Sequence, residues 1–211
     1  LVPTLVGNLF RPGGIFSSAN VLSAVGTAVG QFAGDMLKHE LAPRAYVVDE
    51  FGVHVIDPSS PDADVPVVVQ YIDFHGRMPT AVAVGLAGGR AYVASYGDGS
   101  PTVSVLDTAN NNQIIATINV GESGDEPIAL TLAPDGSRLY VVNAGSGTVS
   151  VIDTAANAVT ATIDVGDTPM ALALTPDGSK AYVANQESSS VSVIDTVTNT
   201  VSATIGISNY F

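Results

Sequence analysis

The sequence predicts an all-β fold assembled from copies of one unit, and two repeated landmarks carry this prediction. The first landmark is a tyrosine followed by valine, and it occurs at Tyr46, Tyr92, Tyr140 and Tyr182. The second is an aspartate after a Val-Ile or Val-Leu pair, and it occurs at Asp57, Asp107, Asp153 and Asp195. Successive tyrosines are 46, 48 and 42 residues apart, and successive aspartates are 50, 46 and 42 residues apart. Between the landmarks, alternating apolar residues divided by turn-forming residues indicate short β-strands.

The last copy shows the repeated unit most clearly. Its alternating runs predict strands at about residues 170–174, 181–185, 191–195 and 201–205. Four short antiparallel strands in about 40–45 residues are typical of one blade of a β-propeller, which buries its faces against neighbouring blades. The chain is therefore predicted to hold a propeller region at residues 41–211. Its four recognisable four-stranded blades are expected at about 41–77, 78–124, 125–167 and 168–206.

The first blade is predicted to lack its innermost strand. Pro43 and Arg44 directly precede the first tyrosine, so this copy begins at its second strand, and fifteen strands are expected in all. Residues 2–9 or 206–211 could supply the missing strand. Three arrangements stay open: a closed four-bladed propeller, an arc completed by a second copy or another chain, and part of a larger ring. An unsealed edge is expected at Tyr46–Asp57 and Val201–Ile205, where a partner strand could pair.

Residues 1–40 are predicted to be a different kind of segment, a linker followed by one N-terminal α-helix. Apolar residues at helical spacing between residues 17 and 38 give this helix an amphipathic face. Gly26, Gly30 and Gly34 form a small-residue stripe through which another helix could make contact. Polar residues interrupt the uncharged stretch, so we do not expect it to span a membrane. We expect the helix to pack on the propeller or on a preceding domain.

Three motifs of the repeat resemble a known family. Pro-Asp-Gly precedes a Tyr-Val-x-Asn strand, and Val-Ile-Asp-Thr follows, most clearly in the last two copies. In these features residues 41–206 resemble the YVTN β-propeller repeats of surface-layer and other extracytoplasmic proteins. The second copy departs at 86–89 and at Ser95, and the first at Asp49 and in the insertion 58–66. The resemblance implies a propeller outside the cytoplasm, secreted, periplasmic or at the cell surface, and it implies no particular activity.

Few residues suggest a catalytic, metal-binding or cofactor-binding site. The chain has no cysteine, and its three histidines do not have the spacing of a metal site. Its sequence contains no nucleophile elbow, phosphate-binding loop or dinucleotide fingerprint. No cofactor is predicted, although two acidic loops offer weak calcium ligands, namely Asp62, Asp64, Glu122, Asp125 and Glu126. The landmark tyrosines and aspartates recur once per blade, and we interpret them as packing and turn-fixing residues.

The sequence favours a non-enzymatic, extracytoplasmic scaffold or binding module that makes protein or glycan contacts at a cell envelope. A protein partner or a second copy is expected to complete the ring. The alternative is an enzyme, or an accessory domain of one, of the lactonase or quinoprotein propeller type that acts on a small molecule. A nucleic-acid-binding propeller is disfavoured because the net charge is −13.

Overall fold

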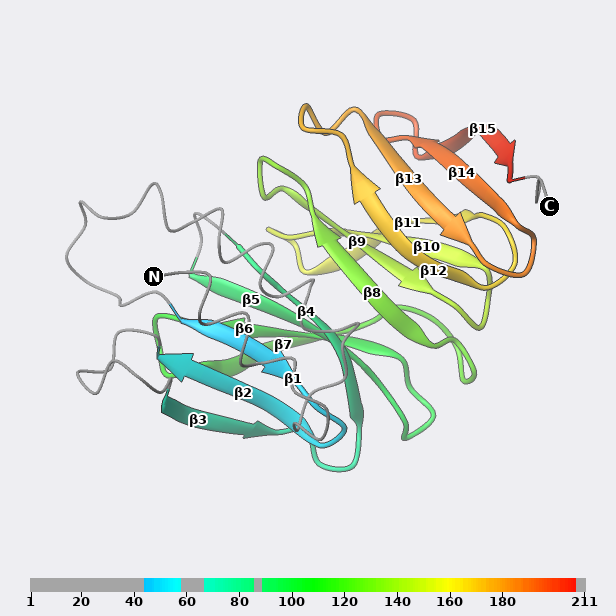
Figure 1. Cartoon of the computed structure of the whole chain (residues 1–211). Helices are drawn as coiled ribbons and strands as arrows, with labels where there is room; N and C mark the ends of the chain where they lie inside the picture. Colours follow the sequence, from blue (N-terminus) through cyan, green and yellow to red (C-terminus); the bar gives the residue numbers. More distant parts are fainter. Residues whose placement is uncertain (1–43, 58–66, 86–88, 208–211) are drawn as a thin grey trace.

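The predicted all-β fold is confirmed. The computed structural model describes residues 44–57, 67–85 and 89–207, and within these ranges it contains fifteen β-strands, the number expected from the sequence. The strands form four antiparallel sheets, each built from consecutive strands (Figure 1). The helix expected between residues 17 and 38 lies outside the described residues, as do the candidate strand at residues 2–9 and most of the segment 206–211.

Each sheet follows the chain from its inner strand to its outer strand. The first sheet contains β1 (Ala45–Val48), β2 (Gly52–Asp57) and β3 (Val67–Asp73). The second contains β4 (Met78–Val84), β5 (Arg90–Tyr96), β6 (Thr102–Asp107) and β7 (Gln113–Asn119). The third contains β8 (Pro127–Leu132), β9 (Arg138–Asn143), β10 (Thr148–Asp153) and β11 (Ala158–Asp164). The fourth contains β12 (Pro169–Leu174), β13 (Lys180–Asn185), β14 (Ser190–Asp195) and β15 (Thr200–Gly206).

The first sheet is the short one. It has three strands in the described part of the chain, in the order β1-β2-β3, and β1 carries the landmark Tyr46 that lies on the second strand of the other sheets. This agrees with the expectation that the first copy begins at its second strand.

The sheets share their irregularities as well as their strands. In each sheet the register between the last two strands shifts at the same place, just before the residue that precedes the landmark aspartate. Such a bulge increases the local twist of a strand pair. The Pro-Asp-Gly turns are also alike, because Gly136 and Gly178 have φ angles of +73° and +70° and each donates its N–H to the carbonyl three residues earlier, on Ala133 or Thr175. The repeat therefore fixes the shape of each sheet.

The core lies between the sheets. Each of the first three sheets presents its landmark tyrosine to the next sheet, which receives it on a face of aliphatic residues. Three clusters result: Tyr46 with Ala91, Val93 and Leu106; Tyr92 with Leu139, Val141 and Ile152; Tyr140 with Ala181, Val183 and Ile194. The inner strands β4, β8 and β12 lie side by side, and the first and fourth sheets stand at opposite ends of the row (Figure 1). No helix in the described ranges is long and apolar enough to cross a membrane.

Candidate functional site

The four landmark tyrosines have the same sequence context but not the same exposure. Tyr46, Tyr92 and Tyr140 are 3%, 3% and 1% exposed, whereas Tyr182 is 40% exposed. The first three are covered by the sheet that follows each of them, and among the described residues no sheet follows the fourth. The side of the fourth sheet that carries Tyr182 is therefore exposed, whereas the same side of each earlier sheet is covered by the next sheet.

The uncovered surface is apolar across all four strands. Strand register places six exposed side chains on it, and we call this group the Tyr182 face: Ala171, Ala173, Tyr182, Ala184, Ala203 and Ile205. Val193, at its centre, is 6% exposed. None of these residues is charged or can accept a proton near neutral pH. The face is suited to contact with another apolar surface, because such a contact removes apolar area from water.

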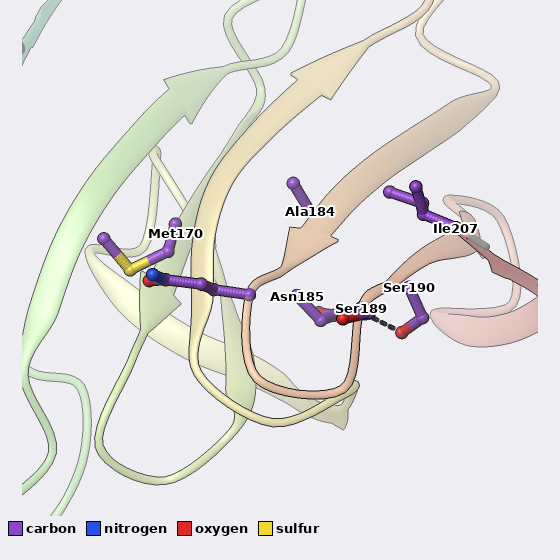
Figure 2. Close-up of a pocket in the computed structure, with 7 residues that line it drawn as sticks. Met170, Ala184, Asn185, Ser189, Ser190 and Ile207 are labelled. Atoms are coloured by element: carbon purple, nitrogen blue, oxygen red, sulfur yellow. Dashed lines mark hydrogen bonds between the residues drawn. The ribbon is translucent and has the colours of Figure 1, made fainter. Parts of the chain in front are cut away.

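A shallow hollow of about 330 Å³ borders this face at the end of β13. Figure 2 shows Met170 and Ile207 on its two sides, with the turn that follows β13 between them. Asn185 donates from Nδ2 to the hydroxyl of Ser190 at 3.1 Å and of Ser192 at 2.9 Å, while its buried Oδ1 has no partner. Asn143 in the third sheet makes the matching bond to Ser150 and also leaves its Oδ1 without a partner. The asparagine thus belongs to the repeat.

A second hollow, of about 280 Å³, lies beside the two Pro-Asp-Gly turns. Hydrogen bonds from the Thr175 hydroxyl, and then from the backbone and hydroxyl of Ser179, lower the pKa of Asp177 to about 2. The backbone and hydroxyl of Ser137 likewise hold the pKa of Asp135 below its ordinary value. Both carboxylates are ionised at neutral pH and accept hydrogen bonds within their own turns. A general acid must instead carry a proton that it can donate to the substrate.

The landmark aspartates have similar surroundings. Asp107, Asp153 and Asp195 each accept, through Oδ1, the N–H groups two and three residues later, at 2.8–3.1 Å. The bonds from Thr198 and then Val197 lower the pKa of Asp195. Asp57 ends β2, and the residues that follow it lie outside the described ranges.

One histidine–carboxylate pair was not predicted from the sequence. His54 Nε2 lies 2.6 Å from Asp49 Oδ2, and Asp49 Oδ1 accepts the N–H groups of Phe51 and Gly52. Burial alone would raise the pKa of Asp49, but the bonds from His54 and from the two backbone groups lower it overall. The His54 ring packs against Tyr71, with centroids 5.1 Å apart. Asp49 stands where the second copy has serine and the last two copies have asparagine, and this difference was the available signal.

Three of the proposed calcium ligands, Glu122, Asp125 and Glu126, lie in the described residues. Asp62 and Asp64 lie outside the described residues. In the loop between β7 and β8, Asp125 accepts the backbone N–H of Glu122 at 2.9 Å. Across the described part of the chain, no group of three or more His, Asp or Glu side chains could hold a metal ion.

The inner strands have no charged side chain in β4, β8 or β12. Two threonines link neighbouring inner strands through backbone carbonyls. Thr80 donates to Pro127 O at 2.5 Å, and Thr131 donates to Leu172 O at 3.2 Å. These hydroxyls therefore serve contacts between sheets.

A comparison with known families gives a clear result for the repeats. The family model described as "Lactonase, 7-bladed beta-propeller" matches residues 90–204, which is more than half of the chain. This chain belongs to that family. The match supports a family of propellers, and it does not single out the YVTN repeat. The described residues form four sheets, whereas the name of this family indicates seven blades.

A solved structure gives the same fold. Hydrazine synthase from Kuenenia stuttgartiensis matches with a TM-score of 0.63 and 24% sequence identity, over 82% of this chain and 52% of that chain. At this identity the likeness concerns the fold alone. The present member of the seven-bladed family spans about half the length of that protein. No curated protein matches the chain.

Proposed function

We propose that this chain is a non-enzymatic propeller module that acts by contact, as a scaffold or binding surface for proteins or glycans at a cell envelope. The observation that carries the proposal is the Tyr182 face, an uncharged apolar surface. Its Tyr182 and Ile205 are exposed, whereas their counterparts in the third sheet, Tyr140 and Ile163, are buried. Its position outside the cytoplasm rests on the resemblance to surface-layer repeats. A protein partner that completes the ring is part of the proposal, and the net charge of −13 disfavours nucleic acid as that partner.

The use of the polar side chains supports contact rather than catalysis. Asp107, Asp153 and Asp195 accept backbone N–H groups, and Asp135 and Asp177 close turns. An acid or base for catalysis must be free to exchange a proton with a substrate. These five carboxylates are instead engaged by their own backbone.

The proposal is tested by retention on cell envelopes. Purified chain is incubated with washed bacterial wall preparations that retain their surface proteins, and the bound fraction is measured against chain concentration. We expect wild type to bind and Ala184→Arg to bind at least tenfold more weakly, because a charge then lies on the apolar face. Val197→Arg is the matched control, since Val197 is 80% exposed in a turn away from that face. Absence of binding, or equal loss in both variants, would contradict the proposal.

The second candidate is an enzyme of the lactonase propeller type, or an accessory domain of one. Two observations favour it: the name of the family and the His54–Asp49 pair, in which Asp49 Oδ2 holds the imidazole through Nε2. Hydrolysis of a panel of small lactones by the purified chain, with His54→Gln as control, tests this candidate. Turnover by wild type that disappears in the variant would favour the enzyme. We also expect no cofactor requirement, so added calcium or chelator should leave the melting temperature unchanged.

A further inference from the structure

We infer that the amphipathic segment at residues 17–38 packs, as a helix, on an apolar patch at the outer edge of the first two sheets. The patch consists of four exposed β-branched residues on the edge strands β3 and β7, and we call it the rim patch: Val68, Val69, Ile114 and Ile115. It lies on other sheets than the Tyr182 face, and the inference does not depend on the proposed contact function.

The rim patch is one surface although it belongs to two sheets. Its side chains are about equally exposed, at 49%, 49%, 46% and 47%. Asn112 donates from Nδ2 to Gln70 Oε1 at 2.7 Å, and Gln70 donates from Nε2 to the carbonyl of Asn111 at 3.0 Å. Gln70 directly follows the apolar pair of β3, and Asn112 lies two residues before the apolar pair of β7. These hydrogen bonds therefore hold the two pairs close together.

The rim patch departs from the repeat. In every sheet the outer strand has one extra residue at its bulge. This residue is Thr160 in the third sheet and Ser202 in the fourth, and each hydroxyl donates to a backbone carbonyl of the neighbouring strand, at 3.1 Å and 3.0 Å. In the first two sheets it is Val69 and Ile115, which cannot make this bond. Native proteins cover or interrupt an apolar edge strand, because it can otherwise pair with other chains.

Residues 17–38 lie outside the described residues, but their sequence offers a surface that matches the patch. Five apolar residues follow one another at steps of three, four, three and four, and we call them the apolar stripe: Leu22, Val25, Val29, Phe32 and Met36. Polar residues occupy the opposite side of such a helix, namely Asn20, Ser23, Thr27, Gln31, Asp35 and Lys38. At a rise of 1.5 Å per residue the stripe is about 21 Å long. Stacked sheets lie about 10 Å apart, so the stripe is long enough to cross the edges of two sheets.

The chain enters the first sheet close to the rim patch. Ala45, the first residue of β1, pairs with Ile56 on β2, and Ile56 pairs with Val68 on β3. Adjacent strands lie about 4.8 Å apart, so the start of β1 is about 10 Å from Val68. Residues 39–44 connect the segment to β1, and an extended stretch of this length spans about 20 Å. The segment can therefore reach the patch without any change in the described sheets.

The size of the patch favours a tethered segment over a separate molecule. A stable interface between two proteins buries more than about 1,000 Å² in total, which four β-branched side chains cannot provide. A segment joined by a short connection is present at an effective concentration in the millimolar range, so a smaller apolar contact is sufficient. We therefore take the occupant to be this chain's own residues 17–38.

Crosslinking in the full chain tests the inference. The sequence has no cysteine, so pairs of cysteines can be introduced without background. Ile115→Cys is combined with Phe32→Cys, in the apolar stripe, or with Gln31→Cys, on the opposite side. A bismaleimide with a short spacer is added at low protein concentration, and the crosslinked monomer is measured. We expect about fivefold more of it for the pair with Phe32→Cys. Equal yields from the two pairs, or none from either, overturn the inference.

A second arm measures whether the patch is covered. Ile115→Cys alone is labelled with a small maleimide in the full chain, with and without Val25→Asp and Val29→Asp. We expect these two changes to speed labelling about tenfold, because a carboxylate packed on apolar surface is unfavourable and the segment should detach. Ser23→Asp and Thr27→Asp add the same charges to the polar side and should leave the rate unchanged.

Two results of the labelling arm contradict the inference. Equal rates with and without the changes in the apolar stripe show that the segment does not cover the patch. If labelling also slows as protein concentration rises, a second copy is the occupant instead. The crosslinking arm contains no aspartate variant, so it decides the question even if these variants fail to fold.

Discussion

Truncation of equivalent tyrosines should have unequal cost, and the difference follows from their surroundings. Tyr140 is 1% exposed between the third and fourth sheets, and Tyr182 is 40% exposed on the fourth. Replacing a large buried aromatic residue by alanine costs about 3–5 kcal/mol, as lost transfer free energy plus a cavity. For Tyr182 part of the transfer energy is already absent and little cavity forms, so Tyr182→Ala should cost about 1–2 kcal/mol.

Urea unfolding followed by far-UV circular dichroism measures both variants. With a slope of about 3 kcal/mol per molar urea, the midpoint should fall by about 1.3 M for Tyr140→Ala and about 0.5 M for Tyr182→Ala. The two variants control each other, because both remove the same atoms from the same position of the repeat. Equal shifts would refute the reasoning, since the fourth sheet's tyrosine would then be as well covered as that of the third.

Three other predictions concern single groups. Asp177 has a folded pKa of about 2, below its ordinary value of 3.8, so its contribution to stability is present above pH 4 and is lost as pH falls towards 2. A plot of melting temperature against pH should therefore be flatter between pH 4 and pH 2 for Asp177→Asn than for wild type. The same plot for both proteins would contradict this role of Asp177. Burial raises the pKa of Tyr46 to about 12, so its contribution is present below pH 10 and is lost as pH rises towards 12. Tyr46→Phe also removes the 2.6 Å hydrogen bond to Asn112 and should lower the free energy of unfolding by about 1–2 kcal/mol. In an absorbance titration the variant should lack the last phenolate step. If that step persists, it belongs to another tyrosine. Gly178→Ala should cost about 1–2 kcal/mol because φ there is +70°, whereas Gly206→Ala, in open space, should be nearly neutral; equal melting temperatures would contradict this.

Periodicity was enough to place the strands. The last copy predicted strands at 170–174 and 181–185, and the structure has them at Pro169–Leu174 and Lys180–Asn185. Alternation and turn residues are local properties, so they can be read from one copy of the repeat. The three-stranded first sheet of the described residues was also predictable, because Pro43 and Arg44 directly precede Tyr46 and the copy therefore begins at its second strand.

The candidate site was harder to predict, because exposure is not a local property. Tyr140 and Tyr182 have nearly the same neighbours in sequence, and the difference in their burial depends on whether another sheet follows. The sequence therefore predicted the positions of the tyrosines, but it did not predict that the Tyr182 face is exposed. The contact between His54 and Asp49 was missed for a related reason. It joins Asp49, in the turn after β1, to His54 on β2, and periodicity does not describe the contacts of turn side chains.

Each described sheet packs mainly on its immediate neighbours, and no closely packed pair of described strands joins sheets that are not adjacent. In such an architecture, opening proceeds from the ends, where a sheet has one neighbour instead of two. Backbone amides of β13 and β14 should exchange with deuterium sooner than those of β9 and β10, although both pairs of strands are bonded on both sides in their sheets. Resistance to local unfolding should therefore differ from sheet to sheet and be lowest at the ends of the row.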